Sequence, residues 1–387
     1  MNYSFVALTF LISVIIAWII IPRILLISIK KKLFDEPNER KIHKFVVPRL
    51  GGVSFFPTIL FAVCCVFAFR YLFGYEVKAI IAEYILPEML LFICGLTLLY
   101  VIGIADDLVG VRYHKKFFIQ LLCAVFFPIS GLWINNLYGL LGVYEISAWI
   151  GMPLTVLTVI FITNAINLID GIDGLASGLS SVALIVFGYL FLLNELYTYS
   201  MIAFASLGVL IPFFYFNVFG NATEGRKIFM GDTGSLTLGY ILSFLAIRYS
   251  QYNPDIMPYT QGAVVIAFST LLVPALDVVR VVLLRARKGK ALFMPDKNHI
   301  HHKFLDMGFS PRRAMLAILF LSCALSLYNI IMVHYMNITL LFVTDLAAWI
   351  GMHCWWDLVR DKKLYKLESL EEFSTESSTE RIYRKTV

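Results

Sequence analysis

Charge is scarce in this sequence. Asp, Glu, Lys and Arg together make up 15% of its 387 residues, whereas 59% of the residues are hydrophobic. Soluble domains carry about a quarter of their residues as charged side chains, and disordered chains are poor in apolar ones, so both classes are excluded. The composition predicts a chain whose main solvent is lipid.

Cysteines are few and scattered. All six lie in apolar stretches and no two have a CxxC spacing: Cys64, Cys65, Cys94, Cys123, Cys323 and Cys354. This pattern excludes the usual zinc sites and a disulfide framework. We interpret these residues as small hydrophobic side chains buried in the membrane.

Long apolar runs dominate instead. A helix needs about 20 apolar residues to cross a hydrocarbon core of about 30 Å, and lipid leaves a spanning backbone few alternatives. Eleven such runs are present: 5–27, 50–69, 84–104, 117–137, 144–163, 179–193, 199–216, 234–247, 261–284, 314–333 and 338–355. They predict an all-α, polytopic integral membrane protein with about eleven transmembrane helices. No Lys or Arg precedes the first run, which is too long for a signal-peptide core, so we expect it to be retained.

Positive charge predicts the orientation. Eleven helices alternate their connections between two sides, and one set of connections holds 27 of the 32 Lys and Arg residues. Since Lys and Arg of short loops stay on the cytoplasmic side, we expect the N-terminus outside and the C-terminus inside. The net charge of +6 then belongs to one face, and it suits anionic lipid head groups or anionic substrates better than nucleic acid.

We expect two segments. Residues 1–360 form one transmembrane domain, and residues 361–387 form a cytoplasmic tail rich in Ser, Thr and Glu. We expect this polar tail to be frayed or disordered.

Four polar clusters lie on the predicted cytoplasmic side. The first is the pair Asp106–Asp107, followed by a basic stretch that includes Lys116. Adjacent carboxylates repel each other unless a cation is near, and Mg²⁺ held by one or two carboxylates and substrate phosphates is the usual answer. A solvated pair of loop charges is the alternative.

The second cluster is NAINLIDGIDGLASG, residues 164–178. It places Asn167, Asp170 and Asp173 among glycines directly after an apolar run. A carboxylate at membrane depth costs roughly 2.5 to 3.5 kcal/mol, so two within four residues indicate function rather than a polar loop cap.

The third cluster is RKIFMGDTGSLTLGY, residues 226–240. Asp232 precedes a predicted helix, whose N-terminus favours phosphate, and Phe229 is placed to stack on a flat base. A helix N-cap is the alternative for Asp232, and a topological anchor is the alternative for Arg226.

The fourth cluster is NHIHHKF, residues 298–304, with His299, His301 and His302. This spacing is compatible with a metal, but no soft ligand is near, so we favour hydrogen bonds from the histidines to phosphate. A fifth patch, KIHKFVVPRLGG at residues 41–52, is more typical of positive-inside topology than of an active site when taken alone.

Together, PRLGG, the aspartate pair, NLIDGIDGL, FMGDTGSL and HIHH resemble the polyprenyl-phosphate N-acetylhexosamine-1-phosphate transferase superfamily (MraY, TagO and WecA types), over about residues 40–310. The segment before IFMGD and the form HIHH are most similar to the WecA-like undecaprenyl-phosphate GlcNAc-1-phosphate transferases.

The resemblance implies a cytoplasmic active-site cleft and Mg²⁺, for which Mn²⁺ could substitute. It also implies transfer of GlcNAc-1-phosphate, or another HexNAc-1-phosphate, from a UDP-sugar to undecaprenyl phosphate, with release of UMP. Such a reaction in a bacterial plasma membrane begins the synthesis of lipid-linked cell-surface glycans such as cell-wall polymers, lipopolysaccharide and O-antigen. UDP-MurNAc-pentapeptide is the alternative donor, and a homodimer is left open.

The resemblance also assigns roles. It implies catalytic roles for Asp106, Asp107, Asp170, Asp173 and His299, substrate contacts for Asn167, Phe229, Lys116, Arg226, His301 and His302, and Mg²⁺ ligands in Asp232 and Asp107. We expect the lipid phosphate to attack in line, with a covalent aspartyl-phosphate route as the alternative. A transporter would need acidic residues in mid-helix and inverted repeats; we interpret the sequence as having neither and therefore disfavour this alternative.

Overall fold

The computed structural model describes residues 2–33, 47–74, 79–289 and 298–386, and almost all of them are helical. The helices are α1 (Asn2–Lys30), η1 (Gly51–Ser54), α2 (Phe55–Leu72), α3 (Ala79–Val109), α4 (Tyr113–Ile129), α5 (Ala148–Ile169), α6 (Leu175–Leu193), α7 (Tyr197–Phe214), η2 (Tyr215–Phe219), α8 (Gly231–Ser250), α9 (Ala263–Ser269), α10 (Leu272–Arg287), α11 (Ile300–Asp306), α12 (Pro311–Met332) and α13 (Ile338–Thr386). One antiparallel hairpin joins β1 (Asn136–Leu140) to β2 (Val143–Glu145). An all-α fold is therefore confirmed.

Each of the eleven apolar runs contains helix, and 261–284 contains the pair α9 and α10. The run 117–137 is helical only as far as Ile129, and its last residues belong to β1. Within the described residues, eight helices are long and apolar enough to cross a membrane, and the pair α9–α10, bent by 77°, makes a ninth candidate. Helices α4 and α8 do not meet the same criterion of length and apolar composition. The chain is thus a multi-pass membrane protein, while the number eleven stays a prediction.

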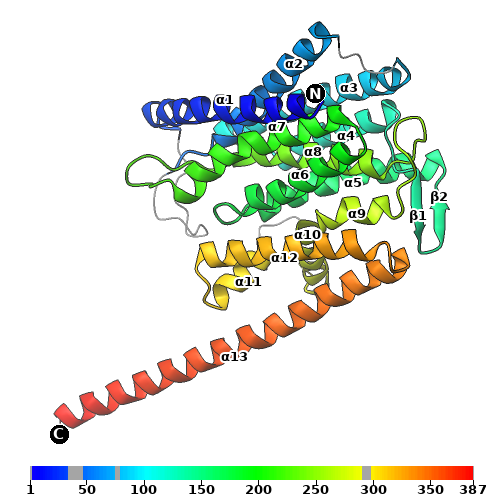
Figure 1. Cartoon of the computed structure of the whole chain (residues 1–387). Helices are drawn as coiled ribbons and strands as arrows, with labels where there is room; N and C mark the ends of the chain where they lie inside the picture. Colours follow the sequence, from blue (N-terminus) through cyan, green and yellow to red (C-terminus); the bar gives the residue numbers. More distant parts are fainter. Residues whose placement is uncertain (1, 34–46, 75–78, 290–297, 387) are drawn as a thin grey trace.

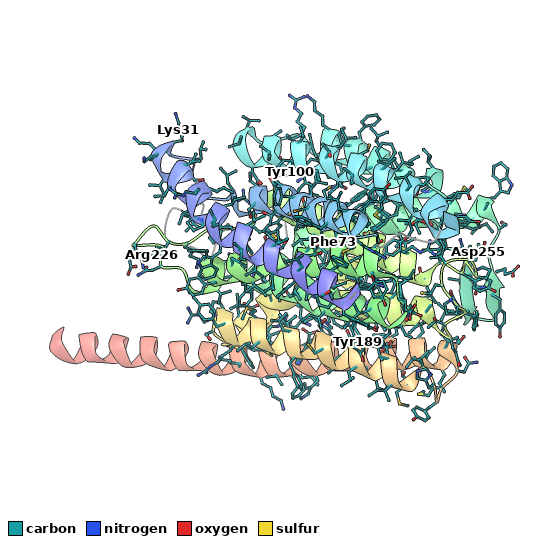
Figure 2. All side chains as sticks on the ribbon, turned by 45° about the horizontal axis from the view of Figure 1, so that its top comes forward. Lys31, Phe73, Tyr100, Tyr189, Arg226 and Asp255 are labelled. Carbon is teal, nitrogen blue, oxygen red and sulfur yellow. The ribbon has the colours of Figure 1, made fainter. Side chains whose placement is uncertain are left out.

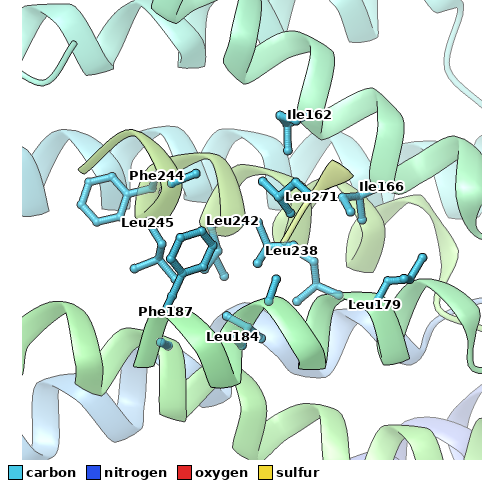
Figure 3. Packing of buried hydrophobic residues seen from close by; sticks show 14 of the residues in the cluster. Ile162, Ile166, Leu179, Leu184, Phe187, Leu238, Leu242, Phe244, Leu245 and Leu271 are labelled. Atoms are coloured by element: carbon cyan, nitrogen blue, oxygen red, sulfur yellow. The ribbon is translucent and has the colours of Figure 1, made fainter. Parts of the chain in front are cut away.

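Helix α8 lies at the centre of the bundle, and nearly all of its side chains are buried. Small residues let its neighbours approach closely: a side chain on Gly239 would meet the backbone of Thr163 in α5, and one on Gly103 of α3 would meet the backbone of Thr233. Such close approach is how helices pack in lipid, where no hydrophobic force drives them together. Figure 3 shows Leu238 and Leu242 of this helix between side chains of α5 and α6.

The connections divide between the two ends of the bundle. Lys31 and Arg226, from connections predicted to be cytoplasmic, lie at one end, and Asp255 lies at the other (Figure 2). The β1–β2 hairpin is at the Asp255 end, whereas α11, which carries the HIHH motif, is at the opposite end (Figure 1). The polar motifs therefore face the same side of the molecule.

The tail differs from the expectation of a frayed or disordered segment, because α13 continues as a helix to Thr386. Its distal part projects away from the bundle (Figure 1). No Gly or Pro interrupts residues 352–386, and Glu, Lys and Leu are good helix formers. Helix propensity along this stretch explains the difference.

Candidate active site

The aspartate pair at the end of α3 meets the first turn of α8. Asp107 Oδ1 accepts a hydrogen bond from the backbone N of Asp232 at 2.8 Å. Its Oδ2 accepts from the backbone N and the hydroxyl of Thr233, at 2.9 and 2.6 Å. A carboxylate at this position satisfies N–H groups that lack a partner within the helix and complements the helix dipole. Both oxygens of Asp107 thus fix the helix that presents Asp232.

Asp106 is connected to Asp232 by a lysine that contacts both carboxylates. The ammonium of Lys116, on α4, lies 2.8 Å from Asp106 Oδ2 and 2.6 Å from Asp232 Oδ2. The other oxygen of Asp106 accepts from the backbone N of Val111 at 2.6 Å. The Lys116 ammonium therefore lies between two carboxylates, Asp106 and Asp232, that are 126 residues apart in the sequence.

Asn167, from the last turn of α5, completes the surroundings of Asp232. Its amide nitrogen donates to Asp232 Oδ1 at 2.7 Å and to the hydroxyl of Ser235 at 2.8 Å. The aspartate pair, the NLIDGIDG segment and the GDTG turn are thereby brought together, although they come from three separate helices.

Asp173 lies beside the base-stacking candidate. It forms a close ion pair with Lys227, and the Lys227 ammonium is 5.9 Å from the centre of the Phe229 ring. The loop that carries Asp173 is tied down at Gly174, which has a φ of +78° and donates its N–H to Asn217 at 2.7 Å. Since Gly adopts a positive φ without strain, a glycine is needed there.

Asp170 follows the last residue of α5, and its side chain is exposed. Partial burial among these groups raises its pKa to about 7, and the charges of Asp173 and Asp232 act in the same direction. The positive charge of Arg49 opposes the shift. Asp170 can thus hold or release a proton near neutral pH.

The PRLGG segment belongs to this site, which its interpretation as a topological signal did not anticipate. Gly51 and Gly52 donate backbone hydrogen bonds to Phe229 and Met230, both at 2.9 Å, and Phe229 donates to Pro48 at 2.8 Å. A side chain on Gly52 would collide with the backbone of Gly234. This ladder holds Arg49 beside the carboxylates. Residues 41–46 of the same patch lie outside the described residues.

The histidine motif is held by a carboxylate that the sequence analysis missed. Asp277, fully buried on α10, accepts from Ile300 N at 2.9 Å and lies 2.8 Å from His299 Nδ1. Arg280 donates to it at 3.0 Å. Because Asp277 accepts at Nδ1, the Nε2 of His299 is left for a ligand. The signal that could have revealed it was a carboxylate inside the apolar run 261–284, which also contradicts the expectation that no acidic residue lies in mid-helix.

His301 packs against the NLIDGIDG segment, since a side chain on Gly171 would collide with its Nε2. The imidazole is buried, which lowers its pKa to about 3, and the neighbouring His302 and His299 act in the same direction. His302 is half-buried on α11, with its ring centre 4.3 Å from that of His301. His301 is therefore neutral at physiological pH.

Arg226 is the predicted site residue that the structure places apart from the others. Its side chain is 73% exposed on the loop before α8, and it forms an ion pair with Glu224 at 3.6 Å. Lys227, which the sequence analysis had not singled out, occupies the position beside Phe229 instead.

A divalent cation would find two suitable oxygens here. Among the described residues, no group of three His, Cys, Asp or Glu side chains is placed to hold a metal. Mg²⁺, however, usually takes one or two carboxylates and completes its shell with water and substrate phosphates. The Lys116 ammonium marks a place for positive charge between Asp106 and Asp232, so these residues fit such an ion.

Comparison with known proteins agrees with this arrangement. Residues 89–250, which include the aspartate pair, the NLIDGIDG segment and Asp232, match the sequence model of Glycosyl transferase family 4. A Bacillus subtilis protein named probable undecaprenyl-phosphate N-acetylglucosaminyl 1-phosphate transferase is 31% identical over 84% of this chain and 85% of its own length.

Two further relatives bear the name undecaprenyl-phosphate alpha-N-acetylglucosaminyl 1-phosphate transferase. The Yersinia pestis protein is 29% identical over 79% of this chain and 78% of its own length. The Escherichia coli K12 protein is 30% identical over 75% of this chain and 73% of its own length. With its motifs, its helical bundle and these relatives, the chain belongs to Glycosyl transferase family 4, among the polyprenyl-phosphate N-acetylhexosamine-1-phosphate transferases.

Proposed function

We propose that this protein transfers GlcNAc-1-phosphate from UDP-GlcNAc to undecaprenyl phosphate and releases UMP. The observation that carries the proposal is the cation-bridged pair of Asp106 and Asp232, within the part of the chain that matches the family. The names of the three relatives supply the acceptor lipid and the GlcNAc group.

The site answers the main physical difficulty of this reaction. Both reactants are anions, so they repel each other until positive charge and hydrogen bonds offset that repulsion. Lys116, Lys227 and Arg49 bring positive charge to the carboxylates of the site. One phosphoanhydride is broken while another forms, so the exchange needs no ATP.

Asp106 and Asp232 are the residues that would hold Mg²⁺. When bound there, the ion would neutralise the oxygens of the donor diphosphate and favour departure of UMP. Asp107 supports this role by anchoring the first turn of α8, since its two oxygens are engaged by Asp232 and Thr233.

The remaining residues divide between the nucleotide and the phosphates. Asp173 and Phe229 would hold uracil, with Lys227 between them. Asp170, with a pKa near 7, would accept a proton from the lipid phosphate as that phosphate attacks in line. His299, whose Nδ1 is held by Asp277, would contact the departing phosphate through Nε2 and would donate to it when the ring is protonated at both nitrogens.

We assign the site to the cytoplasmic side of a bacterial plasma membrane, with the N-terminus outside and the C-terminus inside. The clustering of Lys and Arg on one set of connections supports this orientation, and the three relatives are bacterial. The product would be the first lipid-linked intermediate of a cell-surface glycan.

The test uses purified protein, undecaprenyl phosphate, Mg²⁺ and three donors: UDP-GlcNAc, UDP-GalNAc and UDP-MurNAc-pentapeptide. We expect UMP release with UDP-GlcNAc, loss of turnover in EDTA, and at least about a hundredfold loss in Asp232→Asn. Asp255→Asn, which changes an exposed aspartate at the opposite end of the bundle (Figure 2), is the matched control.

The outcomes separate the alternatives. UMP release from UDP-MurNAc-pentapeptide alone would overturn the GlcNAc assignment. A phosphorylated enzyme trapped with UDP-sugar in the absence of lipid would overturn direct attack in favour of a covalent intermediate.

A further inference from the structure

Lys116 lies where its ammonium can affect metal binding as well as charge balance. Its ammonium is in contact with one oxygen from each of two carboxylates, at 2.8 Å from Asp106 and 2.6 Å from Asp232. The three side chains are largely buried: 17% of the Lys116 side chain is exposed, 13% of Asp106 and 26% of Asp232. The lysine therefore fills the space between the carboxylates and does not merely lie near them.

The remaining carboxylate oxygens around this point already have partners. Asp106 Oδ1 accepts from Val111 N at 2.6 Å, and Asp232 Oδ1 accepts from Asn167 at 2.7 Å. Both oxygens of Asp107 accept from the first turn of α8. A cation that enters between the two carboxylates, on the side where each of them presents Oδ2, meets the same two atoms that Lys116 contacts.

A divalent ion placed between those two oxygens would compete with the ammonium for the same space. Mg²⁺ binds carboxylate oxygens at about 2.1 Å, so it would fall in the space that Nζ occupies. Two positive charges held a few ångströms apart in a partly buried site also repel strongly. The ammonium of a lysine sits on a flexible four-carbon stem, so it can withdraw without any change in the backbone.

We infer that Lys116 is an internal counter-ion that exchanges with the divalent cation: it occupies the site between Asp106 and Asp232 in the metal-free protein and withdraws when the metal binds. This inference rests on the proposed function, because it takes the metal site of that proposal as given. Lys116 offsets one of the two carboxylate charges of the metal-free site, lowers its affinity for the metal, and makes tight binding depend on substrate phosphates that add ligands.

The test measures Mn²⁺ binding by electron paramagnetic resonance in detergent, without substrate. We expect Lys116→Gln to bind Mn²⁺ about tenfold more tightly than the wild type, because the competing cation is gone. Lys115→Gln removes the same charge from the neighbouring exposed position on α4. We expect it to change the affinity by less than about threefold, since solvent screens exposed charge.

A second measurement leaves the chain unaltered. Mg²⁺ should increase the rate at which an acylating reagent modifies Lys116, measured by mass spectrometry relative to Lys115. The increase should be absent in Asp232→Asn. This arm decides the matter even if Lys116→Gln does not fold.

The outcomes distinguish the exchange from the function on which it rests. Asp232-dependent Mn²⁺ binding that is equal in the wild type and Lys116→Gln, with no change in labelling, would overturn the exchange and leave the proposed metal site intact. Absence of Mn²⁺ binding that depends on Asp232 would overturn both.

Discussion

Asp107 Oδ2 accepts two hydrogen bonds from Thr233, one from its backbone N at 2.9 Å and one from its hydroxyl at 2.6 Å. A residue at the end of α3 thus caps the first turn of α8, the helix that presents Asp232. Paired aspartates are easily interpreted as two equivalent metal ligands. In this structure they differ, because Asp106 faces the bridging cation and Asp107 faces a helix N-terminus.

Asp107→Asn should therefore destabilise the metal-free protein. Asparagine keeps one acceptor oxygen where Asp107 has two, so the cap is weakened. Loss of a whole cap costs about 0.5 to 2 kcal/mol, and we expect a lower thermal unfolding midpoint in EDTA. Asp106→Asn should lower this midpoint less, since Lys116 would still form its ion pair with Asp232. Equal midpoints for Asp107→Asn and the wild type in EDTA would contradict the capping role.

Asp277→Asn should reduce kcat by about 10- to 100-fold, the usual effect of losing a residue that orients a functional histidine. Asparagine keeps the size of the side chain but no longer holds His299 by charge. The matched control is Asp345→Asn, a second buried aspartate, which accepts a hydrogen bond from Asn329 on α12. Steady-state UMP release measures both variants. Similar activity in Asp277→Asn and the control would exclude the orienting role.

Gly171→Ala should damage both activity and stability, because the added carbon would collide with Nε2 of the buried His301. Overpacking of this kind costs about 1 to 3 kcal/mol. Gly351→Ala is the control, since a side chain there meets open space. We expect the control to unfold within a few degrees of the wild type. A Gly171→Ala protein with normal turnover would show that the histidine motif need not pack against this segment.

The raised pKa of Asp170 predicts how stability changes with pH. The folded protein holds this proton up to a pKa of about 7, whereas the unfolded chain releases it near 4. The folded state thus binds more protons between these values, and the contribution of Asp170 to stability is present below about pH 4 and is lost as the pH rises through 7.

Asp170→Asn should remove this dependence. The difference between the unfolding midpoints of the wild type and the variant, measured in EDTA, should favour the wild type more at pH 5 than at pH 8. A difference that stays constant across this range would mean that Asp170 titrates with an ordinary pKa.

Agreement between sequence and structure is best where one local pattern is sufficient. Every apolar run predicted as a spanning segment contains helix, because lipid demands internally satisfied backbone groups whatever the neighbours are. The prediction was less complete for residues whose role depends on distant partners. Arg49 was interpreted as a topological signal, Asp277 was not noticed, and the exposed Arg226 was preferred over Lys227.

By itself the sequence determined that this protein lies in lipid, that it is helical and which chemical groups its motifs carry, because hydropathy and residue type are local properties. It also marked Asp106, Asp107 and Asp232 as a set. Only the tertiary structure decided what each of them does. Hydrogen bonds and ion pairs act over about 3 Å, and whether a carboxylate faces a helix N-terminus or a lysine depends on how α3, α4 and α8 pack together.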